Sequence, residues 1–317
     1  MFPDESFQMK VLITGSSGLI GTNAALALMD RGDEVVGIDR RANTWTDRID
    51  TRLMDLNQAT AADLPGESFD VVLQCAAHAK VFELVQQPDR AMENIRMLFN
   101  VLEYCRSSRT PIVFASSREV YGDILRHVTD ESAADFVVAE SPYSASKIAG
   151  EALVYSYAQC YKLPYLVFRF SNVYGRFDND LDRMERVIPL FIRRISRGAP
   201  ITVFGPKKVL DFTYIDDCVS GVIAGLDALT EGNVQCQTIN LATGQGYTLL
   251  DLVNMIGMCL AKTPDATFQE ARVGEVTRYV ADISRARSLL RYEPRFPLTS
   301  GLIKAIQWQR ETGWLKD

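Results

Sequence analysis

The chain has 317 residues and a formal net charge of -6, with 47% hydrophobic and 23% charged residues. This length and composition are typical of a globular protein with a substantial core, built as one large domain or two joined lobes. The acidic balance argues against nucleic-acid binding, and no apolar stretch approaches the roughly 20 residues that a membrane span needs.

The six cysteines show no CxxC spacing, and the chain has only two histidines. These residues do not form a recognisable zinc pattern, so we expect free thiols and no bound metal. The first nine residues lack the basic and apolar regions of a signal peptide. We therefore expect a cytoplasmic protein that does not associate with membranes.

Strands and helices alternate from residue 10 onwards. Residues 10–14 form a short apolar run that predicts a buried strand, residues 22–31 have helical composition, and residues 34–38 predict a second strand that ends at Asp39. A strand, a helix and a second strand in this order form a right-handed crossover in a parallel sheet.

The alternation continues for about 160 residues. Further strands are expected at residues 69–74, 111–115 and 163–170, and helices at residues 90–106 and 144–161. This repetition predicts a doubly wound α/β sheet of the Rossmann type.

Beyond residue 170 the pattern loosens. We expect a helix at residues 187–197, extended segments at 201–204 and 211–215, and a strand at 238–241. The predicted organisation is a Rossmann domain of residues 9–170, to which residues 212–243 return, and a smaller C-terminal α+β substrate lobe of residues 171–211 and 244–317.

A glycine-rich segment follows the first predicted strand and opens the first helix. Its glycines are Gly15, Gly18 and Gly21, and they allow a pyrophosphate to approach the backbone at the helix N-terminus. Asp39, at the end of the next strand, can accept hydrogen bonds from a ribose diol, which favours NAD over NADP. The adjacent Arg40 weakens that preference.

Two further segments carry groups suited to acid–base chemistry. Tyr143 and Lys147 are four residues apart, so they share one face of the predicted helix. We expect the Lys147 ammonium and the positive nicotinamide ring of NAD to lower the pKa of the Tyr143 phenol, so that it can accept a proton. Ser117 follows a predicted strand, where ligands bind in such sheets, and can hydrogen-bond the reacting oxygen.

Together these motifs resemble the extended short-chain dehydrogenase/reductases, and more narrowly the nucleotide-sugar epimerases, dehydratases and decarboxylases. The resemblance rests on the TGSSGLIG segment, Ser117 with Tyr143-x-x-x-Lys147, Asn94, and the RFSNVYG segment at residues 169–175. It covers nearly the whole chain, and it implies tightly bound NAD, a UDP-sugar substrate and a homodimer.

The resemblance also implies roles for individual residues. Ser117, Tyr143 and Lys147 are implied to be catalytic, and Glu119 is a further catalytic candidate. Those implied to contact NAD, besides Tyr143 and Lys147, are Gly15, Gly18, Leu19, Ile20, Gly21, Asp39, Arg40, Asp55, Leu56, Ala76, Ala77 and Asn94. Those implied to contact the substrate are Arg118, Asn172, Arg176, Arg186, Val187, Phe204 and Arg272.

Three reactions fit such a site, and all begin by oxidising a sugar carbinol to a ketone. Relatives that dehydrate carry an Asp-Glu pair where this chain has Arg118 and Glu119, and a guanidinium cannot act as a general acid. We therefore expect a 4-epimerase, with UDP-glucuronate favoured and UDP-glucose or UDP-galactose possible. Decarboxylation of UDP-glucuronate remains the alternative, because Glu119 matches the decarboxylases although Leu210 stands where they carry an arginine.

An arginine-rich stretch leads to a hypothesis about the substrate. Arg118, or one of Arg176, Arg183 and Arg186, is expected to bind a substrate carboxylate. The competing interpretation is a solvated helix whose acidic and basic side chains pair with each other. A non-catalytic NAD-binding scaffold is a more distant alternative, against which the intact Ser117, Tyr143 and Lys147 argue.

Overall fold

The computed structural model describes residues 8–121, 130–131, 139–178, 186–272 and 274–315. Its centre is a seven-stranded sheet in which every pair of neighbours is parallel. The strand order is β10-β6-β5-β4-β1-β2-β3. The bounds are β1 (Lys10–Thr14), β2 (Glu34–Asp39), β3 (Asp50–Leu53), β4 (Val71–Gln74), β5 (Ile112–Ser117), β6 (Tyr165–Phe170) and β10 (Gln237–Leu241). The predicted doubly wound α/β fold is thus confirmed.

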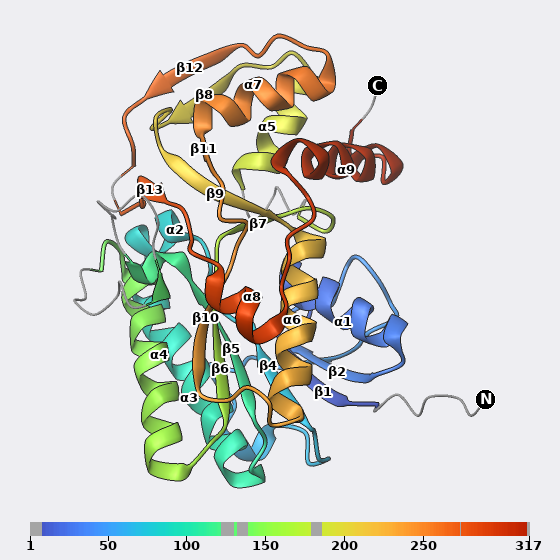
Figure 1. Cartoon of the computed structure of the whole chain (residues 1–317), viewed down its shortest axis with the longest axis vertical. Helices are drawn as coiled ribbons and strands as arrows, with labels where there is room; N and C mark the ends of the chain where they lie inside the picture. The colour runs from blue at the N-terminus through green and yellow to red at the C-terminus, as the bar shows by residue number, and fades with distance from the viewer. Residues whose placement is uncertain (1–7, 122–129, 132–138, 179–185, 273, 316–317) are drawn as a thin grey trace.

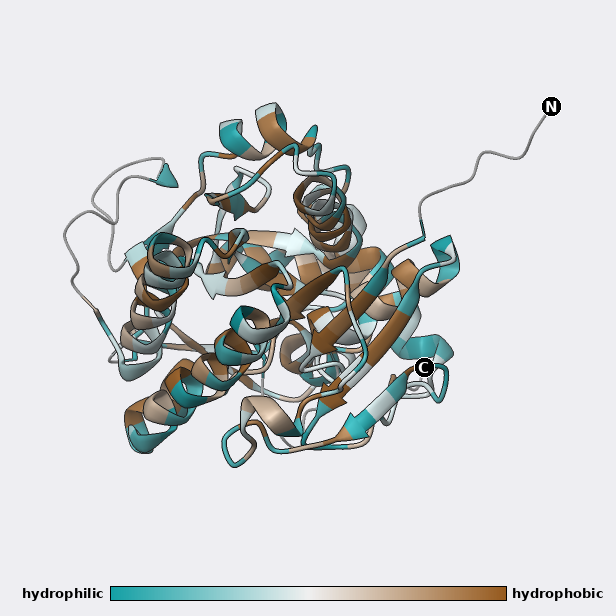
Figure 2. Ribbon diagram, turned by 90° about the horizontal axis from the view of Figure 1, so that it is seen from below, coloured by the Kyte–Doolittle hydropathy of each residue, from teal (hydrophilic) through white to brown (hydrophobic). Residues whose placement is uncertain are grey.

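Helices cover both faces of this sheet (Figure 1). On one face lie α1 (Leu19–Arg31) and α6 (Ile215–Thr230), and on the other α3 (Asp89–Ser108) and α4 (Pro142–Tyr161). Alternate strand residues divide between the two cores: in β5, Val113 packs towards α1 and α6, and Phe114 towards α3 and α4. Figure 2 shows these hydrophobic strands enclosed by helices that also carry hydrophilic residues. Burial on both faces explains why the strands read as continuous apolar runs.

A second group of elements lies beyond the carboxyl ends of the main strands, in the upper part of Figure 1. It contains the sheet β11-β9-β13, with β7 paired to β9, and the pair β12-β8. Its strands are β7 (Asn172–Tyr174), β8 (Ile201–Phe204), β9 (Val209–Tyr214), β11 (Gly246–Thr248), β12 (Ala266–Gln269) and β13 (Arg278–Tyr279). Its helices include α5 (Val187–Ser196), α7 (Leu249–Leu260) and α9 (Leu298–Glu311).

The remaining described helices are short. They are η1 (Ala61–Asp63), α2 (Val81–Gln86), η2 (Arg118–Tyr121) and α8 (Ser284–Leu290), which packs against α6 and β10. No helix in the described ranges has the length and apolar character needed to cross a membrane.

Several element boundaries differ from the expectation for local reasons. Helix α1 begins at Leu19 rather than at residue 22, directly after the Gly18 cap. Helix α4 begins at Pro142 because Ser141 closes a capping box, in which the Ser144 N–H donates to the Ser141 hydroxyl at 3.1 Å. Tyr143 therefore sits in the first turn of α4.

The strand order reverses between β1 and β4. The chain runs outward from β1 through β2 to β3, then returns beside β1 with β4 and continues through β5 to β6. In such sheets the crevice at the carboxyl ends of the strands where the order reverses is the usual ligand site. This rule places the search for a site between the glycine-rich turn after β1 and the segment after β4.

Candidate active site

A cavity of about 390 Å³ opens at this reversal point and continues towards the upper elements. Most of the predicted residues line it. The catalytic candidates on its wall are Ser117, Glu119, Tyr143 and Lys147. The predicted coenzyme residues on its wall are Gly15, Gly18, Leu19, Ile20, Gly21, Asp39, Arg40, Asp55, Leu56, Ala76 and Ala77. The predicted substrate residues on its wall are Arg118, Asn172, Arg186 and Val187.

Asn94 does not lie on the cavity wall. It is buried in α3, where its Oδ1 accepts the His78 N–H at 2.7 Å and its Nδ2 donates to the His78 carbonyl at 3.1 Å. Asn94 thus fixes the backbone of His78, which does line the cavity. Asn94 thus supports the turn after β4, and its direct contact with the coenzyme stays a prediction.

Three predicted substrate residues also lie away from the wall. Arg176 pairs with Asp216 at the start of α6. The Arg272 guanidinium lies 4.1 Å from the centre of the Phe204 ring and 5.0 Å from that of Phe82. In this conformation both Arg272 and Phe204 are engaged in a cation–π stack rather than facing the cavity. Arg183 falls outside the described residues.

The glycine-rich turn is shaped by close backbone contacts. A Cβ at Gly15, whose φ is +72°, would meet the Ala76 backbone nitrogen at 2.8 Å. A Cβ at Gly21 would collide with the Gly15 carbonyl, so the glycine at this position allows α1 to pack tightly against the turn. No side chain caps the N-terminus of α1, so its first N–H groups are available to an anion. The turn therefore fits a phosphate-bearing coenzyme.

Asp39 is held at the edge of this turn. Its Oδ2 accepts the Ser17 N–H at 3.1 Å and its Oδ1 accepts the Arg41 N–H at 3.0 Å. Each carboxylate oxygen keeps further lone pairs towards the cavity, which Asp39 lines. Such a carboxylate can accept two adjacent hydroxyls.

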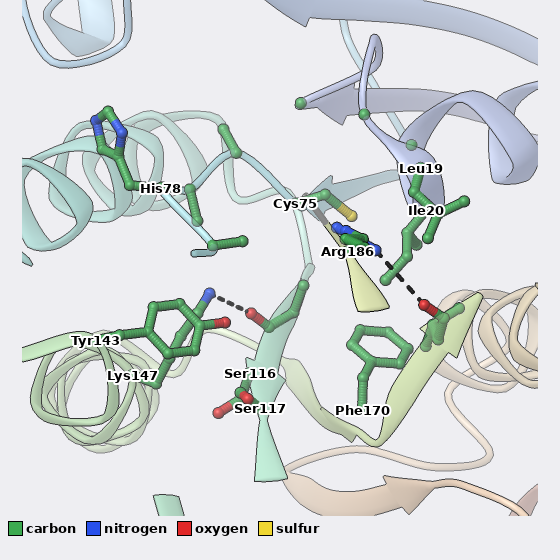
Figure 3. Close-up of a pocket in the computed structure, with 18 of the residues that line it drawn as sticks. Leu19, Ile20, Cys75, His78, Ser116, Ser117, Tyr143, Lys147, Phe170 and Arg186 are labelled. Carbon is green, nitrogen blue, oxygen red and sulfur yellow. Dashed lines mark hydrogen bonds between the residues drawn. The ribbon is translucent and has the colours of Figure 1, made fainter. Parts of the chain in front are cut away.

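The acid–base residues meet at the end of β5 (Figure 3). Tyr143 and Lys147 extend from α4, and Ser117 comes from β5. The Lys147 amine donates to the Ala115 carbonyl at 2.7 Å and lies 5.7 Å from the centre of the Tyr143 ring. The Ser117 hydroxyl lies close enough to Tyr143 to act on the pKa of its phenol, which it lowers. One face of α4 thus presents a phenol and an amine to a strand-end hydroxyl.

Of the two groups expected to lower the pKa of Tyr143, Lys147 alone does not bring it below its ordinary value, and the effect of the nicotinamide ring stays a prediction. Burial raises the pKa of the phenol to about 12, against the opposing effects of Ser117, Arg186 and Arg118. Burial also lowers the pKa of Lys147 to about 8. The low-dielectric surroundings disfavour both charged forms, so the protein alone keeps the phenol protonated at neutral pH.

Arg118 and Glu119 form a buried pair beside this group. The Arg118 Nη2 lies 2.9 Å from a Glu119 oxygen and donates to Asn172 Oδ1 at 3.1 Å. The Arg118 Nη1 and the Glu119 Oε2 are buried without a hydrogen-bond partner among the described residues. Burial raises the pKa of Glu119 despite the adjacent guanidinium.

A second acid–base pair closes the other side of the cavity. The Arg186 Nε lies 3.3 Å from Asp178 Oδ1, and both residues line the wall. Burial raises the pKa of Asp178 to about 7, although Arg186 opposes this shift. The mixed-charge run, for which a solvated helix was the competing interpretation, thus contributes a buried carboxyl to the cavity wall at Asp178.

Sequence reasoning missed several wall residues, among them Cys75, His78 and Asp178. Cys75 and His78 directly follow β4 and flank the predicted Ala76 and Ala77, so the strand-end rule could have found them. His78 Nε2 lies 2.6 Å from a Glu93 oxygen. Nothing in the sequence distinguishes Asp178 from the neighbouring acidic residues.

Comparison with known proteins gives a consistent result. The NAD dependent epimerase/dehydratase family matches residues 11–242. The uncharacterized UDP-glucose epimerase YtcB of Bacillus subtilis is 30% identical over 95% of this chain and 98% of its own length. UDP-glucuronate 4-epimerase 1 of Arabidopsis thaliana is 32% identical over 95% of this chain and 76% of its own length.

A solved structure is also similar to this chain. The UDP-glucuronic acid 4-epimerase of Bacillus cereus, crystallised with UDP-glucuronic acid and NAD, superposes with a TM-score of 0.86. The match is 27% identical and covers 96% of this chain and all of that chain.

The raised pKa of Asp178 predicts how stability depends on pH. Because the folded-state value of about 7 exceeds the ordinary 3.8, ionising Asp178 costs stability progressively as pH rises from about 4 to 7 and fully above 7. Asp178→Asn should therefore leave the melting temperature near that of the wild type at pH 4 and raise it at pH 8. At about 1.4 kcal/mol per pKa unit, we expect a gain of about 1–4 kcal/mol at pH 8.

Thermal melts of both proteins across this pH range measure the effect. Asp30→Asn, at a position whose side chain is 64% exposed, is the matched control and should show no such pH-dependent gain. An equal difference between Asp178→Asn and wild type at pH 4 and pH 8 would contradict the burial of an ionisable carboxyl.

Proposed function

Because the chain belongs to the NAD dependent epimerase/dehydratase family, we propose that it is an NAD-dependent 4-epimerase of a UDP-sugar. The observation that carries this proposal is the meeting of Ser117, Tyr143 and Lys147 in one cavity that continues to the glycine-rich turn. Similarity over 95% of this chain to UDP-glucuronate 4-epimerase 1 and to the UDP-glucose epimerase YtcB supports it.

The first part of the cavity would hold NAD. The uncapped N-terminus of α1 and the glycines of the turn would receive the pyrophosphate, and Asp39 the adenosine ribose. Asp55 and Leu56 would lie beside the adenine. When bound, NAD would supply the oxidised ring that takes up the sugar hydride reversibly.

The chain's own residues move the proton. Tyr143 Oη takes the proton of the sugar 4-hydroxyl as the ketone forms and gives it back when the carbinol re-forms. The Ser117 hydroxyl bonds the same sugar oxygen and holds it beside the phenol. Lys147, fixed to the Ala115 carbonyl, holds the face of α4 that carries Tyr143 against β5, and the positive nicotinamide ring of bound NAD would favour the phenolate.

We propose UDP-glucuronate as the favoured substrate. Of the arginines proposed to bind its carboxylate, Arg118 and Arg186 line the cavity, and the Arg118 Nη1 is a buried donor without a hydrogen-bond partner among the described residues. A buried, unpaired donor favours a ligand that supplies an acceptor. Loss of carbon dioxide requires the carboxylate to stand perpendicular to the ketone plane, and bidentate binding by an arginine opposes that alignment.

Decarboxylation of UDP-glucuronate is the second candidate. Glu119, buried on the cavity wall close enough to Tyr143 to affect the pKa of the phenol, is the observation that favours it. Against it stands Leu210, a buried residue of β9 at the position where the decarboxylases carry an arginine.

Product analysis decides between the two. The purified protein is incubated separately with UDP-glucuronate, UDP-glucose and UDP-N-acetylglucosamine without added coenzyme, and products are identified by NMR. We expect the C4 epimer, with the highest kcat/KM for UDP-glucuronate. A pentose with released carbon dioxide would establish the decarboxylase instead, and equal kcat/KM for UDP-glucose and UDP-glucuronate would exclude the carboxylate contact.

Replacing Tyr143 by Phe separates an enzyme from a scaffold. The variant keeps the ring and loses the group that moves the proton, so turnover should fall by roughly 10²–10⁴-fold while NAD remains bound. NMR assays of epimerisation and the absorbance of released NAD measure the two quantities. Unchanged turnover in Tyr143→Phe would contradict the proposed role of the phenol.

We further propose that the protein forms a homodimer through α3 and α4. These helices pack against each other and carry large apolar side chains that are exposed in the single chain: Met92 and Phe99 on α3 and Tyr155 on α4. Large exposed apolar side chains on two helices that pack together favour association with a second copy.

A charged residue at this surface tests the dimer. Phe99→Glu should convert the dimer to a monomer in sedimentation velocity experiments, because it would bury a carboxylate in the interface. Met258→Glu on α7 is the control at another apolar position, which is even more exposed than Phe99, and it should remain dimeric. A monomeric wild type, or dissociation of the Met258 variant instead, would place association elsewhere or exclude it.

A further inference from the structure

All three tryptophans of the chain lie in one cluster, which the catalytic proposal does not use. Trp45, in the segment after β2, lies 5.6 Å from Trp308 of α9 and 6.2 Å from Trp314, measured between ring centres. Phe177 completes the cluster, at 5.8 Å from Trp45 and 5.6 Å from Trp308. Segments far apart in the sequence thus converge on one phenylalanine.

The backbone of Phe177 adopts the left-handed conformation, with φ of +63°. Bulky residues rarely adopt this conformation, because the Cβ approaches the following carbonyl. Of the other non-glycine residues with positive φ in the described chain, Cys236 directly precedes β10, and four are the C-caps of helices: Arg109, Lys162, Ala261 and Arg291. Phe177 ends no helix, so other contacts must hold its backbone.

One contact holds the backbone directly before Phe177, and others fix Trp45, which packs against its ring. The Asn23 Nδ2 donates to the Arg176 carbonyl at 3.3 Å, just before Phe177. Asn43 Oδ1 accepts the Trp45 N–H at 2.9 Å, and its Nδ2 donates to the Ser16 carbonyl at 3.2 Å. The cluster is therefore anchored to α1 and to the glycine-rich turn.

The residue after Phe177 belongs to the cavity. Asp178 is buried on the cavity wall, whereas Phe177 does not line it and packs on the tryptophans. Asp178 in turn contacts Arg186 at 3.3 Å, and the Arg186 Nη1 reaches the Val173 carbonyl at 3.5 Å. The backbone conformation at Phe177 thus accompanies an arrangement in which Asp178, and not Phe177, faces the cavity.

We propose that Phe177 is a positioning residue for the UDP-sugar. Trp45 and Trp308 hold its ring outside the cavity, so that Asp178 turns inward and aligns Arg186. This inference rests on the proposed function of the same cavity. Phe177 acts through Asp178 and Arg186 and touches no reacting atom. Its removal should therefore weaken substrate binding more than it slows the chemical step.

Kinetics of Phe177 variants test this role in the protein with its bound coenzyme. Phe177→Ala should raise KM for UDP-glucuronate by at least about tenfold and change kcat by less than about threefold, with the NAD content unchanged. Phe177→Tyr keeps the ring and should restore the wild-type KM. Phe177→Leu, a milder change should the alanine variant fail to fold, should give an intermediate KM.

Trp314→Ala is the matched control. Among the ring contacts of the described chain, Trp314 contacts Trp45 and not Phe177, so its loss should reduce the melting temperature without raising KM. A normal KM in Phe177→Ala together with a lower melting temperature would reduce the cluster to a purely structural role. An equal rise of KM in Trp314→Ala would also overturn the assignment.

Calorimetric titration with UDP-glucuronate separates this inference from the proposed function. If the wild type binds this probe without epimerising it, the proposed activity fails, and weaker binding by Phe177→Ala would still support the positioning role. If the wild type epimerises UDP-glucuronate and Phe177→Ala binds it normally, the positioning role alone fails. If the wild type does not bind the probe, both fail.

Discussion

The hydrogen bond from the Lys147 amine to the Ala115 carbonyl fixes the geometry on which the site depends. It joins the first turns of α4 to the carboxyl end of β5, and both partners are buried. Because a buried amine without an acceptor is costly, this bond restricts how α4 can slide along the sheet. Tyr143, one turn earlier on the same face, is thereby held beside Ser117.

A buried charge pair supports the same junction one turn further along α4. Glu151 receives two hydrogen bonds from Arg169 of β6, at 3.0 and 2.7 Å, and one from the Ser116 hydroxyl of β5 at 2.5 Å. These contacts tie α4 to two adjacent strands at once. They do not need to add net stability to matter, because leaving either charge unpaired would be costly. The polar stripe of α4 therefore aligns helix and sheet.

The parts that the sequence could predict are those set by local patterns. β1 was predicted residue for residue because its apolar run is sharply bounded, and the glycine turn followed from spacing alone. The edge strand β3 was missed because it pairs on one side only and its residues are mostly polar and partly exposed. The surroundings of Asp178 and Arg272 could not be predicted for another reason. Burial of the first and aromatic stacking of the second depend on segments distant in sequence, which no local pattern encodes.

A neutral Tyr143 phenol in the protein alone is consistent with the proposal that this phenol exchanges a proton with the sugar hydroxyl. A phenolate waiting in a buried site would be an unpaired charge, and the surroundings that raise the Tyr143 pKa to about 12 suppress it. The same low dielectric strengthens attraction to any cation brought into the cavity. A positively charged coenzyme ring would therefore favour ionisation of Tyr143. Because that ring is itself the hydride acceptor, the phenol would ionise only when the acceptor is in place. Burial disfavours the Tyr143 phenolate in the protein alone, and it strengthens the attraction between the phenolate and a bound coenzyme ring. Deprotonation of Tyr143 would therefore be coupled to coenzyme binding.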